Sequence, residues 1–442
     1  IPYGHGAQLA LSLALYGELL QGSRSFWFGY LQSLPRRTVG IAVLWGAQTQ
    51  AQDEDGRTAR AWAVGTEIEK ELRGEDGVSL LEDVRKYYDS TVRPLLQKLC
   101  DEDKLNGPCT LGGFLHAYSL VSSRAFMVDA YHGLAMVPIA DAFNHTQDHH
   151  VHLESEPDVC VACGSLAQCS HDMEEEDGAT THGRTLPVTG LEVDTCDMAS
   201  NLYIPPFTEV FNTYGEDLTN AQLLARYGFM VSDGNEHDVV SWELEELEGM
   251  YGEDGGAFRR LYLSLVSAWP RDARRWEGCS SVFQPMRSGL SLVVNGDGKL
   301  SHQLWMYCAA RSLQRVGMCG GGVPDVLEFL ARLADLVGVG DADGDEGPSL
   351  PLPRRGLGPP ATQLVLTELA RTVLRLCSRK AAHLGPQPQM STAALGEALD
   401  GVDERWVKTR WAMMEVLSER SMLECCAGTW EELLCLEGGS SE

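Results

Sequence analysis

Apolar residues recur at helical spacing in several segments of the first half of the chain. An Ala- and Leu-rich run over residues 8–20 predicts a buried helix. Between residues 80 and 99 the apolar positions repeat every three to four residues, which is typical of an amphipathic helix. Thr110 is a good N-cap for a third helix that reaches about Phe126. The polar and acidic residues 49–60 predict a loop.

The pattern changes after Met127. Short β-prone pieces follow, separated by Gly, Pro and Asp, at residues 133–139, 151–153 and 209–214. A polar, acidic stretch at 171–183 predicts a solvated loop between two of these pieces.

From Asn220 onward the pattern is mostly helical. The helical segments are residues 221–227, 258–269, 303–316, 325–337, 364–376 and 406–417. Residues 338–360 are rich in Gly, Pro and Asp and predict a linker or a long surface loop. Strands mixed with helices come first and helices alone come later, so the order predicts an α+β domain followed by an all-α domain.

The composition is that of an ordinary globular protein, but the charge is strongly acidic. The 442 residues carry a formal net charge of −28, and 44% of them are hydrophobic. This charge argues against nucleic acid as the main partner, because phosphates require a basic surface. An acidic surface attracts Lys-rich proteins, although solubility alone also explains many of these carboxylates. No apolar run approaches the roughly 20 residues that cross a bilayer, so no membrane partner is expected.

The cysteine content bears on the compartment. Thirteen cysteines are scattered through a large chain whose first residues carry no secretory signal. We therefore expect reduced thiols and a location in the nucleus, the cytoplasm or both.

Four segments carry candidate chemistry: SSRAF (122–126), MVPIADAFNH (136–145), EVFNTYGE (209–216) and NAQLLARYGF (220–229). Each has a structural interpretation when taken singly. Asn144-His145 and Tyr214-Gly215 are typical of turns that follow strands, and Gly228 is typical of a helix C-cap. No single segment identifies a function.

Together and in this order, the four segments closely resemble the SET domain, in the subgroup that includes plant Rubisco lysine methyltransferase. The resemblance is strong over about residues 8–240 and weaker beyond them. It implies a SET catalytic domain over 1–235, made of short β-sheets with a pseudoknot, a helical insert at 9–126 and a loop insert at 146–190. Residues 236–442 would form the subgroup's helical substrate-binding domain.

The resemblance also implies an activity, the transfer of a methyl group from S-adenosyl-L-methionine to a lysine of another protein. Tyr214 matches the family's catalytic tyrosine. The implied donor-binding residues are Arg124, Asn144, His145, Tyr214 and Phe229, and the implied channel residues are Asp141 and Tyr227. Tyr227 is explained equally well as a core tyrosine. We expect a Lys-rich protein substrate, for example a ribosomal or nuclear protein.

The implied chemistry is an in-line displacement by a neutral amine, so most of the acceleration is positioning. Lysine has a pKa of about 10.4, and an apolar channel helps it to lose its proton before attack. The Tyr214 hydroxyl would orient the amine, and the planar guanidinium of Arg124 suits the carboxylate of the donor.

One expected element has no match. SET domains begin with a Gly-rich turn that grips the donor, and Gly4-His5-Gly6 is a poor substitute because no strand precedes it. Since the chain opens with Ile1 rather than Met, we expect this turn to precede Ile1. Two alternatives stay open: a SET-like binding module with an incomplete donor pocket, and a protein-histidine methyltransferase.

The last candidate is a metal site. Cys160 and Cys163 form a C-x2-C pair, and Cys169 and His171 follow closely. These residue types are zinc ligands, so the cluster predicts a structural zinc site, with reduced loop cysteines as the alternative.

Overall fold

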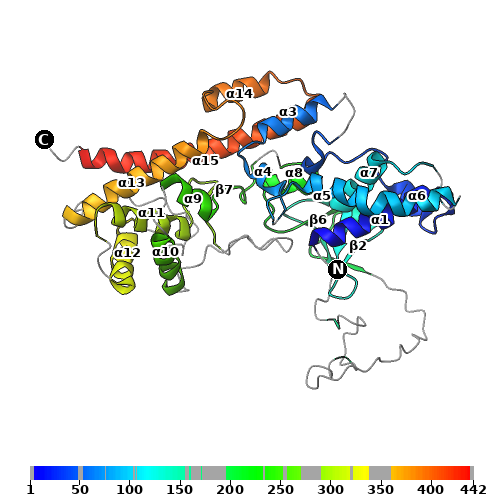
Figure 1. Cartoon of the computed structure of the whole chain (residues 1–442), viewed down its shortest axis with the longest axis horizontal. Helices are drawn as coiled ribbons and strands as arrows, with labels where there is room; N and C mark the ends of the chain where they lie inside the picture. The colour runs from blue at the N-terminus through cyan, green and yellow to red at the C-terminus, as the bar shows by residue number, and fades with distance from the viewer. Residues whose placement is uncertain are drawn as a thin grey trace. The chain divides into compact units, whose positions relative to one another are not determined.

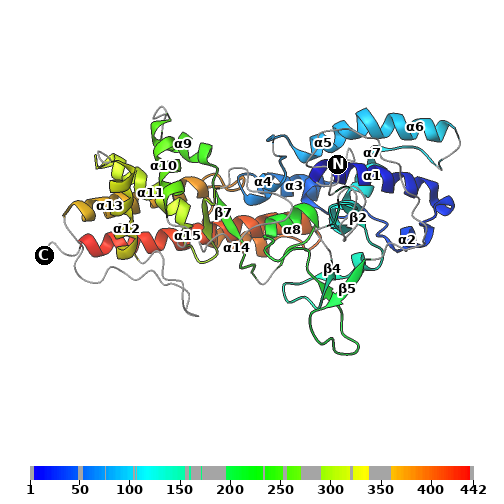
Figure 2. The same cartoon turned by 90° about the horizontal axis from the view of Figure 1, so that it is seen from below.

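Helices and short strands form two compact units (Figures 1 and 2). The computed structural model describes residues 4–47, 53–74, 76–102, 105, 107–154, 159–160, 171, 196–231, 234–251, 256–269, 290–318, 322–337 and 360–438. The first unit comprises 1–48, 77–216 and 225–229, and the second comprises 49–76, 217–224 and 230–442. Among the described helices, none combines the length and the apolar character needed to span a membrane.

The first unit is built around α1 (Gly4–Gln21), which packs against α7 (Leu111–Arg124). Gly113 permits their close approach, because a Cβ at this position would lie 2.7 Å from the Tyr16 ring. The Tyr16 hydroxyl accepts a hydrogen bond from the backbone amide of Thr110 over 2.8 Å. The Thr110 side chain accepts one from the Gly113 amide over 3.1 Å, so the predicted N-cap is confirmed.

The amphipathic segment that the sequence predicts forms two helices joined by a π-helical turn. These are α5 (Leu80–Tyr87), η3 (Tyr88–Val92) and α6 (Arg93–Asp101). Pro94 lies in the first turn of α6, where its missing N–H is tolerated. The shorter helical segments of this unit are η1 (Gly22–Arg24), α2 (Phe28–Ser33), η2 (Ala42–Leu44) and η4 (Ala140–Ala142).

Two sheets complete the first unit. Strands β1 (Ala125–Met127) and β2 (Leu134–Met136) pair antiparallel directly after α7. The other sheet has four strands in the order β3-β6-β4-β5, with bounds β3 (Asn144–His145), β4 (Val151–Glu154), β5 (Asp197–Ser200) and β6 (Phe211–Asn212). The β3–β6 pairing is parallel, with Asn144 opposite Phe211 and His145 opposite Asn212. This register brings the second and third sequence motifs side by side.

The second unit is mainly helical. Its helices are α3 (Glu54–Trp62), α4 (Glu67–Glu71), α9 (Leu244–Tyr251), α10 (Ala257–Ala268), α11 (His302–Arg315), α12 (Val323–Val337), α13 (Pro360–Ala381), α14 (Thr392–Asp400) and α15 (Val407–Gly438). Helices α3, α13 and α14 each pack along α15. The two-stranded sheet of β7 (Val239–Ser241) and β8 (Val293–Asn295), which the sequence did not predict, adds to this unit. Helix α8 (Asn220–Arg226) contributes residues to both units.

The prediction of a loop at residues 49–60 is wrong over residues 54–60, because α3 occupies them, and residues 49–52 lie outside the described residues. The Asp53 side chain accepts a hydrogen bond from the Gly56 amide over 3.0 Å and caps the helix. Acidic residues are favourable in a first helical turn, so the polar composition concealed a helix start. The carboxylate of Asp55 then accepts hydrogen bonds from the backbone amides of Lys408 and Thr409, at 3.1 and 2.9 Å. Asp55 therefore caps α15.

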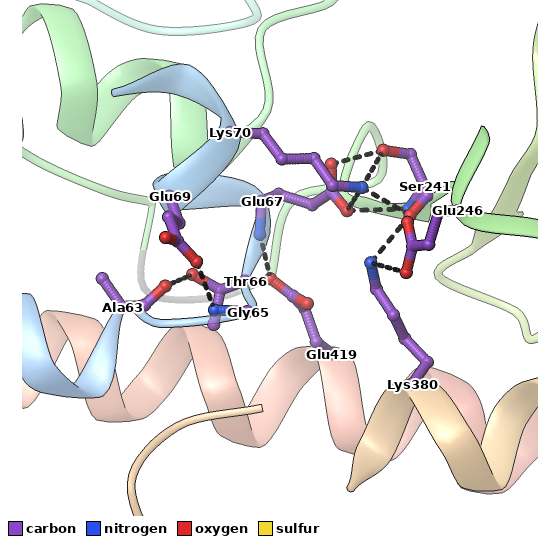
Figure 3. A network of polar contacts seen from close by, with 10 residues as sticks. All are labelled: Ala63, Gly65, Thr66, Glu67, Glu69, Lys70, Ser241, Glu246, Lys380 and Glu419. Atoms are coloured by element: carbon purple, nitrogen blue, oxygen red, sulfur yellow. Dashed lines mark hydrogen bonds and ion pairs between the residues drawn. The ribbon is translucent and has the colours of Figure 1, made fainter. Parts of the chain in front are cut away.

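A buried polar network fixes α4 within the second unit (Figure 3). The Glu67 carboxylate accepts hydrogen bonds from the Ser241 amide, at 2.8 Å, and from Lys70 Nζ, at 2.9 Å. Lys380 Nζ donates to the Ser241 carbonyl oxygen over 3.0 Å, and Glu419 Oε1 accepts from the Glu67 amide over 2.7 Å. The network thus links α4, β7, α13 and α15.

Candidate functional site

The two central motifs meet through a hydrogen bond between His145 and Tyr214. The backbone amide of Tyr214 donates to His145 Nδ1 over 3.1 Å. Because Nδ1 accepts, the neutral ring carries its proton on Nε2. Burial, helped by the neighbouring His149, lowers the pKa of His145 to about 4, so this ring is uncharged at neutral pH.

Four rings form a cluster around this bond. Tyr214 stacks on Tyr227 with ring centroids 4.6 Å apart and on His145 at 5.2 Å. Phe229 lies 6.0 Å from His145 and meets Tyr214 edge-on at 6.1 Å. These separations lie within the range of favourable aromatic contacts. The cluster provides an apolar wall made of residues from three of the four motifs.

The two tyrosine hydroxyls of the cluster stay protonated and can donate hydrogen bonds. Burial raises the pKa of Tyr227 to about 12 and also raises that of Tyr214. The Tyr214 hydroxyl donates to the Phe143 carbonyl oxygen over 3.0 Å. The Tyr227 hydroxyl donates to the Tyr214 carbonyl oxygen over 3.3 Å. Both hydrogen bonds fix the rings to backbone that lies just outside β3 and β6.

A sharp turn places Tyr227 and Phe229 in the cluster. Gly228, which follows the end of α8, has φ of +78°, a conformation that favours glycine. A Cβ at this position would lie 3.0 Å from the carbonyl carbon of Gly40 and 3.0 Å from the amide nitrogen of Ile41. The glycine is therefore required both by its backbone conformation and by a close backbone approach.

A polar group adjoins the aromatic cluster. Arg124, the last residue of α7, donates from Nη1 to the Asp141 carbonyl oxygen over 2.6 Å. The same nitrogen lies 3.8 Å from Asp141 Oδ2. Tyr30, on α2, donates its hydroxyl hydrogen to that carboxylate over 2.7 Å. Asp141 is two residues from Phe143, whose carbonyl oxygen accepts from the Tyr214 hydroxyl, so Arg124 and Asp141 lie close to the ring cluster.

The structure brings together six of the seven residues that the sequence singled out as a site. These are Arg124, Asp141, His145, Tyr214, Tyr227 and Phe229. Asn144 lies beside them on β3, but its side chain is exposed and donates to Glu209 Oε1 over 2.6 Å. The functional roles of all seven residues remain predictions.

The sequence did not single out Tyr30 or Glu209. Tyr30 lies in the aromatic segment SFWFGYLQSL, where its hydroxyl and the indole N–H of Trp27 are the ring groups that can donate a hydrogen bond to a carboxylate. Its partner lies 111 residues away, so no local pattern pairs them. Glu209 is the first residue of the β-prone piece at 209–214, and its position next to Asn144 follows from the β3–β6 register.

Only part of the predicted metal site lies within the described residues. Cys160 Sγ and His171 Nδ1 are 3.7 Å apart. Cys163 and Cys169 lie outside the described residues. Within the described residues, no group of three or more His, Cys, Asp or Glu side chains is arranged to hold a metal ion. The zinc site therefore stays a prediction.

No protein-family model matches the chain. Ribosomal lysine N-methyltransferase 3 of Saccharomyces cerevisiae is 32% identical over 204 residues, which cover 36% of this chain and 36% of that protein. Protein SET DOMAIN GROUP 40 of Arabidopsis thaliana is 25% identical over 299 residues, which cover 66% of this chain and 48% of that protein. The chain thus spans less than half the length of these relatives.

Among solved structures, the SET domain of LSMT bound to lysine and AdoHcy aligns with a TM-score of 0.50 and 18% identity. The alignment covers 97% of this chain and 75% of that one. At this identity the likeness shows the fold, and the predicted α+β SET fold is confirmed. The chain has the fold of a SET domain, and its resemblance to SET-domain protein-lysine methyltransferases, predicted from four motifs, is confirmed by these relatives.

Proposed function

We propose that this protein is a protein-lysine N-methyltransferase that uses S-adenosyl-L-methionine as methyl donor. The His145–Tyr214 hydrogen bond carries the proposal, because it joins two distant motifs within one aromatic cluster beside Arg124. The name of the yeast relative and the lysine and AdoHcy bound to LSMT support it. We propose further that the catalytic domain lies within residues 1–235 and that residues 236–442 form most of the substrate-binding domain, whose compact unit also includes residues 49–76 and 217–224.

The residues present suit the amino-acid end of the donor. Arg124 Nε is buried and has no hydrogen-bond partner among the described residues. A buried guanidinium nitrogen without a partner is costly, and a carboxylate is its natural complement. Arg124 would hold that carboxylate, with Asn144, His145 and Phe229 nearby to bind the rest of the molecule. When bound, S-adenosyl-L-methionine supplies an electrophilic methyl group on a cationic sulfur.

The aromatic cluster suits the other reactant, a lysine amine. Tyr214 and Tyr227 form an apolar wall that excludes water and favours the uncharged amine. The Tyr214 hydroxyl, which remains protonated, orients the amine and stabilises charge that develops during transfer. The neutral imidazole of His145 adds no second positive charge beside a cationic donor. Asp141, which is buried and accepts a hydrogen bond from Tyr30, would help to shape the lysine channel.

The substrate class follows from charge. With a net charge of −28, the protein favours encounter with a Lys-rich partner. We propose a basic protein such as a ribosomal or nuclear protein, and a location in the cytoplasm, the nucleus or both. The name of the yeast relative, a ribosomal lysine N-methyltransferase, favours the ribosomal choice.

The test is transfer of labelled methyl to a ribosomal protein fraction, with mass spectrometry of the modified residue. Tyr214→Phe should lower kcat by at least about tenfold, or about 1.4 kcal/mol of barrier. Tyr131→Phe, at an exposed tyrosine of the same unit, is the matched control and should change kcat little. A methylated histidine would instead identify a histidine methyltransferase. Absence of heat on titration with S-adenosylhomocysteine would favour a binding module.

We also propose that Cys160 and His171 are two ligands of a structural zinc ion, completed by Cys163 and Cys169. Their 3.7 Å separation is compatible with two ligands of one tetrahedral zinc, whose ligand atoms lie roughly 3.5 Å apart for Zn–S and Zn–N bonds of about 2.3 and 2.1 Å. Elemental analysis of the purified protein should find one zinc per chain, which Cys160→Ser together with Cys163→Ser removes. Substoichiometric zinc in the wild-type protein would contradict this proposal.

A further inference from the structure

We propose that Tyr30 and Asp141 are positioning residues that hold the guanidinium of Arg124 ready for the carboxylate of the methyl donor. The inference rests on the proposed function and adds Tyr30 to the residues of its site. It stands on a chain of contacts that joins three separate elements, α2, η4 and the end of α7.

The first link is the hydrogen bond from Tyr30 to Asp141. It spans 2.7 Å from the hydroxyl to Oδ2, and the Asp141 side chain is only 5% exposed. Such a buried carboxylate needs donors, because water does not solvate it. Tyr30 supplies one from a residue 111 positions away. The bond therefore fixes the Asp141 side chain relative to α2.

The second link is from Asp141 to Arg124. The backbone oxygen of Asp141 accepts from Arg124 Nη1 at 2.6 Å, and its carboxylate lies 3.8 Å from the same nitrogen. Both the main chain and the side chain of Asp141 thus lie next to Nη1 of the guanidinium. The planar group offers a second edge, formed by Nε and Nη2, for a bidentate carboxylate. Nε, which belongs to that edge, is buried and has no hydrogen-bond partner among the described residues.

The arrangement explains why Asp141 does not occupy the carboxylate-binding edge of Arg124. A carboxylate free to rotate would form a bidentate pair with the guanidinium and compete with the ligand. The bond from Tyr30 to Oδ2 holds that oxygen 3.8 Å from Nη1, beyond an ordinary hydrogen bond. Removing the Tyr30 hydroxyl frees the carboxylate to pair with Arg124, which weakens binding of the donor.

The test compares Tyr30→Phe with the wild-type protein by calorimetry with S-adenosylhomocysteine and by steady-state kinetics. Because the freed carboxylate competes with the ligand for the guanidinium, Kd for S-adenosylhomocysteine should rise about tenfold or more. KM for S-adenosyl-L-methionine should rise by a similar factor, while kcat at saturating donor changes less than about twofold. Asp141→Asn, which keeps the backbone contact and removes the competing carboxylate, should keep both constants within about twofold of wild type and should restore them when it is combined with Tyr30→Phe.

Thr110→Ala is the matched control, because it weakens the N-cap at the opposite end of α7. It should lower thermal stability without raising Kd, which separates a positioning role from loss of stability. Wild-type affinity in Tyr30→Phe, or equally weak binding in Tyr30→Phe and in the double variant with Asp141→Asn, would overturn this inference and leave the proposed function standing. Absence of heat with the wild-type protein would overturn both.

Discussion

The backbone amide of Tyr214 donates a hydrogen bond to Nδ1 of His145, across 69 residues of sequence and 3.1 Å of space. The bond requires an uncharged acceptor, and burial lowers the pKa of His145 to about 4, which keeps the ring neutral. The contact between the two motifs is therefore sensitive to acid. This property distinguishes it from the purely aromatic contacts around it.

His145→Asn should destabilise the protein more at pH 7.5 than at pH 5. The folded state resists protonation of His145 until about pH 4, whereas the unfolded chain takes up the proton near pH 6.5. The neutral ring thus contributes fully to the free energy of unfolding above pH 6.5, and this contribution is lost as pH falls from 6.5 to about 4. At pH 7.5 the loss of one hydrogen bond should cost about 1 kcal/mol.

Denaturant unfolding at the two pH values measures this difference. His302, whose pKa is also lowered to about 4 by burial, lies in the second unit and contributes with the same sign. Comparison with His302→Asn therefore shows which of the two histidines causes the pH dependence of unfolding. An equal cost of His145→Asn at both pH values would contradict the assigned protonation state.

Gly228→Ala should lower stability and disturb the aromatic cluster. The left-handed backbone costs a residue with a side chain about 1–2 kcal/mol, and the new Cβ also meets backbone atoms of Gly40 and Ile41 at 3.0 Å. Gly17→Ala, inside α1 with nothing within 4 Å, is the opposite case and should stabilise by about 0.5–1 kcal/mol. Thermal unfolding of both variants checks the pair. A neutral Gly228→Ala would mean that this turn can move.

Thr110→Ala should cost about 1 kcal/mol, because the amide of Gly113 loses its side-chain acceptor at the start of α7. Thr110→Ser keeps the oxygen and should restore most of the stability. Urea unfolding of the two variants and the wild-type protein measures the difference. If both variants lose the same amount, the threonine methyl group rather than the cap is responsible.

Relative to the wild-type protein, Glu419→Gln should raise the free energy of unfolding more at pH 8.5 than at pH 5. Burial raises the pKa of Glu419 to about 8, so the folded state keeps a proton that the unfolded chain loses near pH 4.5. The free energy of unfolding of the wild-type protein therefore falls as pH rises from about 4.5 to 8. Glutamine does not ionise, so the variant lacks this fall. Its side-chain oxygen can still accept from the Glu67 amide.

Thermal unfolding between pH 5 and pH 8.5 is the measurement, and each kcal/mol should shift Tm by roughly 2–4 °C. Glu415→Gln is a useful comparison, because burial and the neighbouring Glu419 raise its pKa as well. Parallel curves for wild type and Glu419→Gln would contradict a raised pKa at this position.

Sequence patterns predicted what is local. The Ala- and Leu-rich run over residues 8–20 and the cap at Thr110 depend on neighbours within a few positions, and the structure has the helix in α1 and the cap at the start of α7. The meeting of Asn144-His145 with the Tyr214 segment followed from the resemblance to a known fold. Neither periodicity nor spacing could have supplied it, because the two strands have only two residues each.

The other features of the fold and of the site depend on contacts between residues that are far apart in the sequence. Residues 49–60 look like a solvated loop because the partner that buries α3 is α15, some 350 residues later. Tyr30 looks like a surface aromatic until Asp141 is placed beside it. The short β7 and β8 strands are separated by more than 50 residues and carry no hairpin signal. In each case a segment far away in the sequence decides the outcome.

The cap that Asp55 provides for α15 has a practical consequence for dissecting the molecule. A fragment beginning near residue 236 would keep the longest helix of the second unit but leave the amides of Lys408 and Thr409 without their acceptor. It would also expose the flank of α15 that α3 covers and separate Glu419 from Glu67. The C-terminal helices can be expected to fold on their own only when residues 53–74 are supplied with them, either spliced ahead of the fragment or added in trans as a peptide.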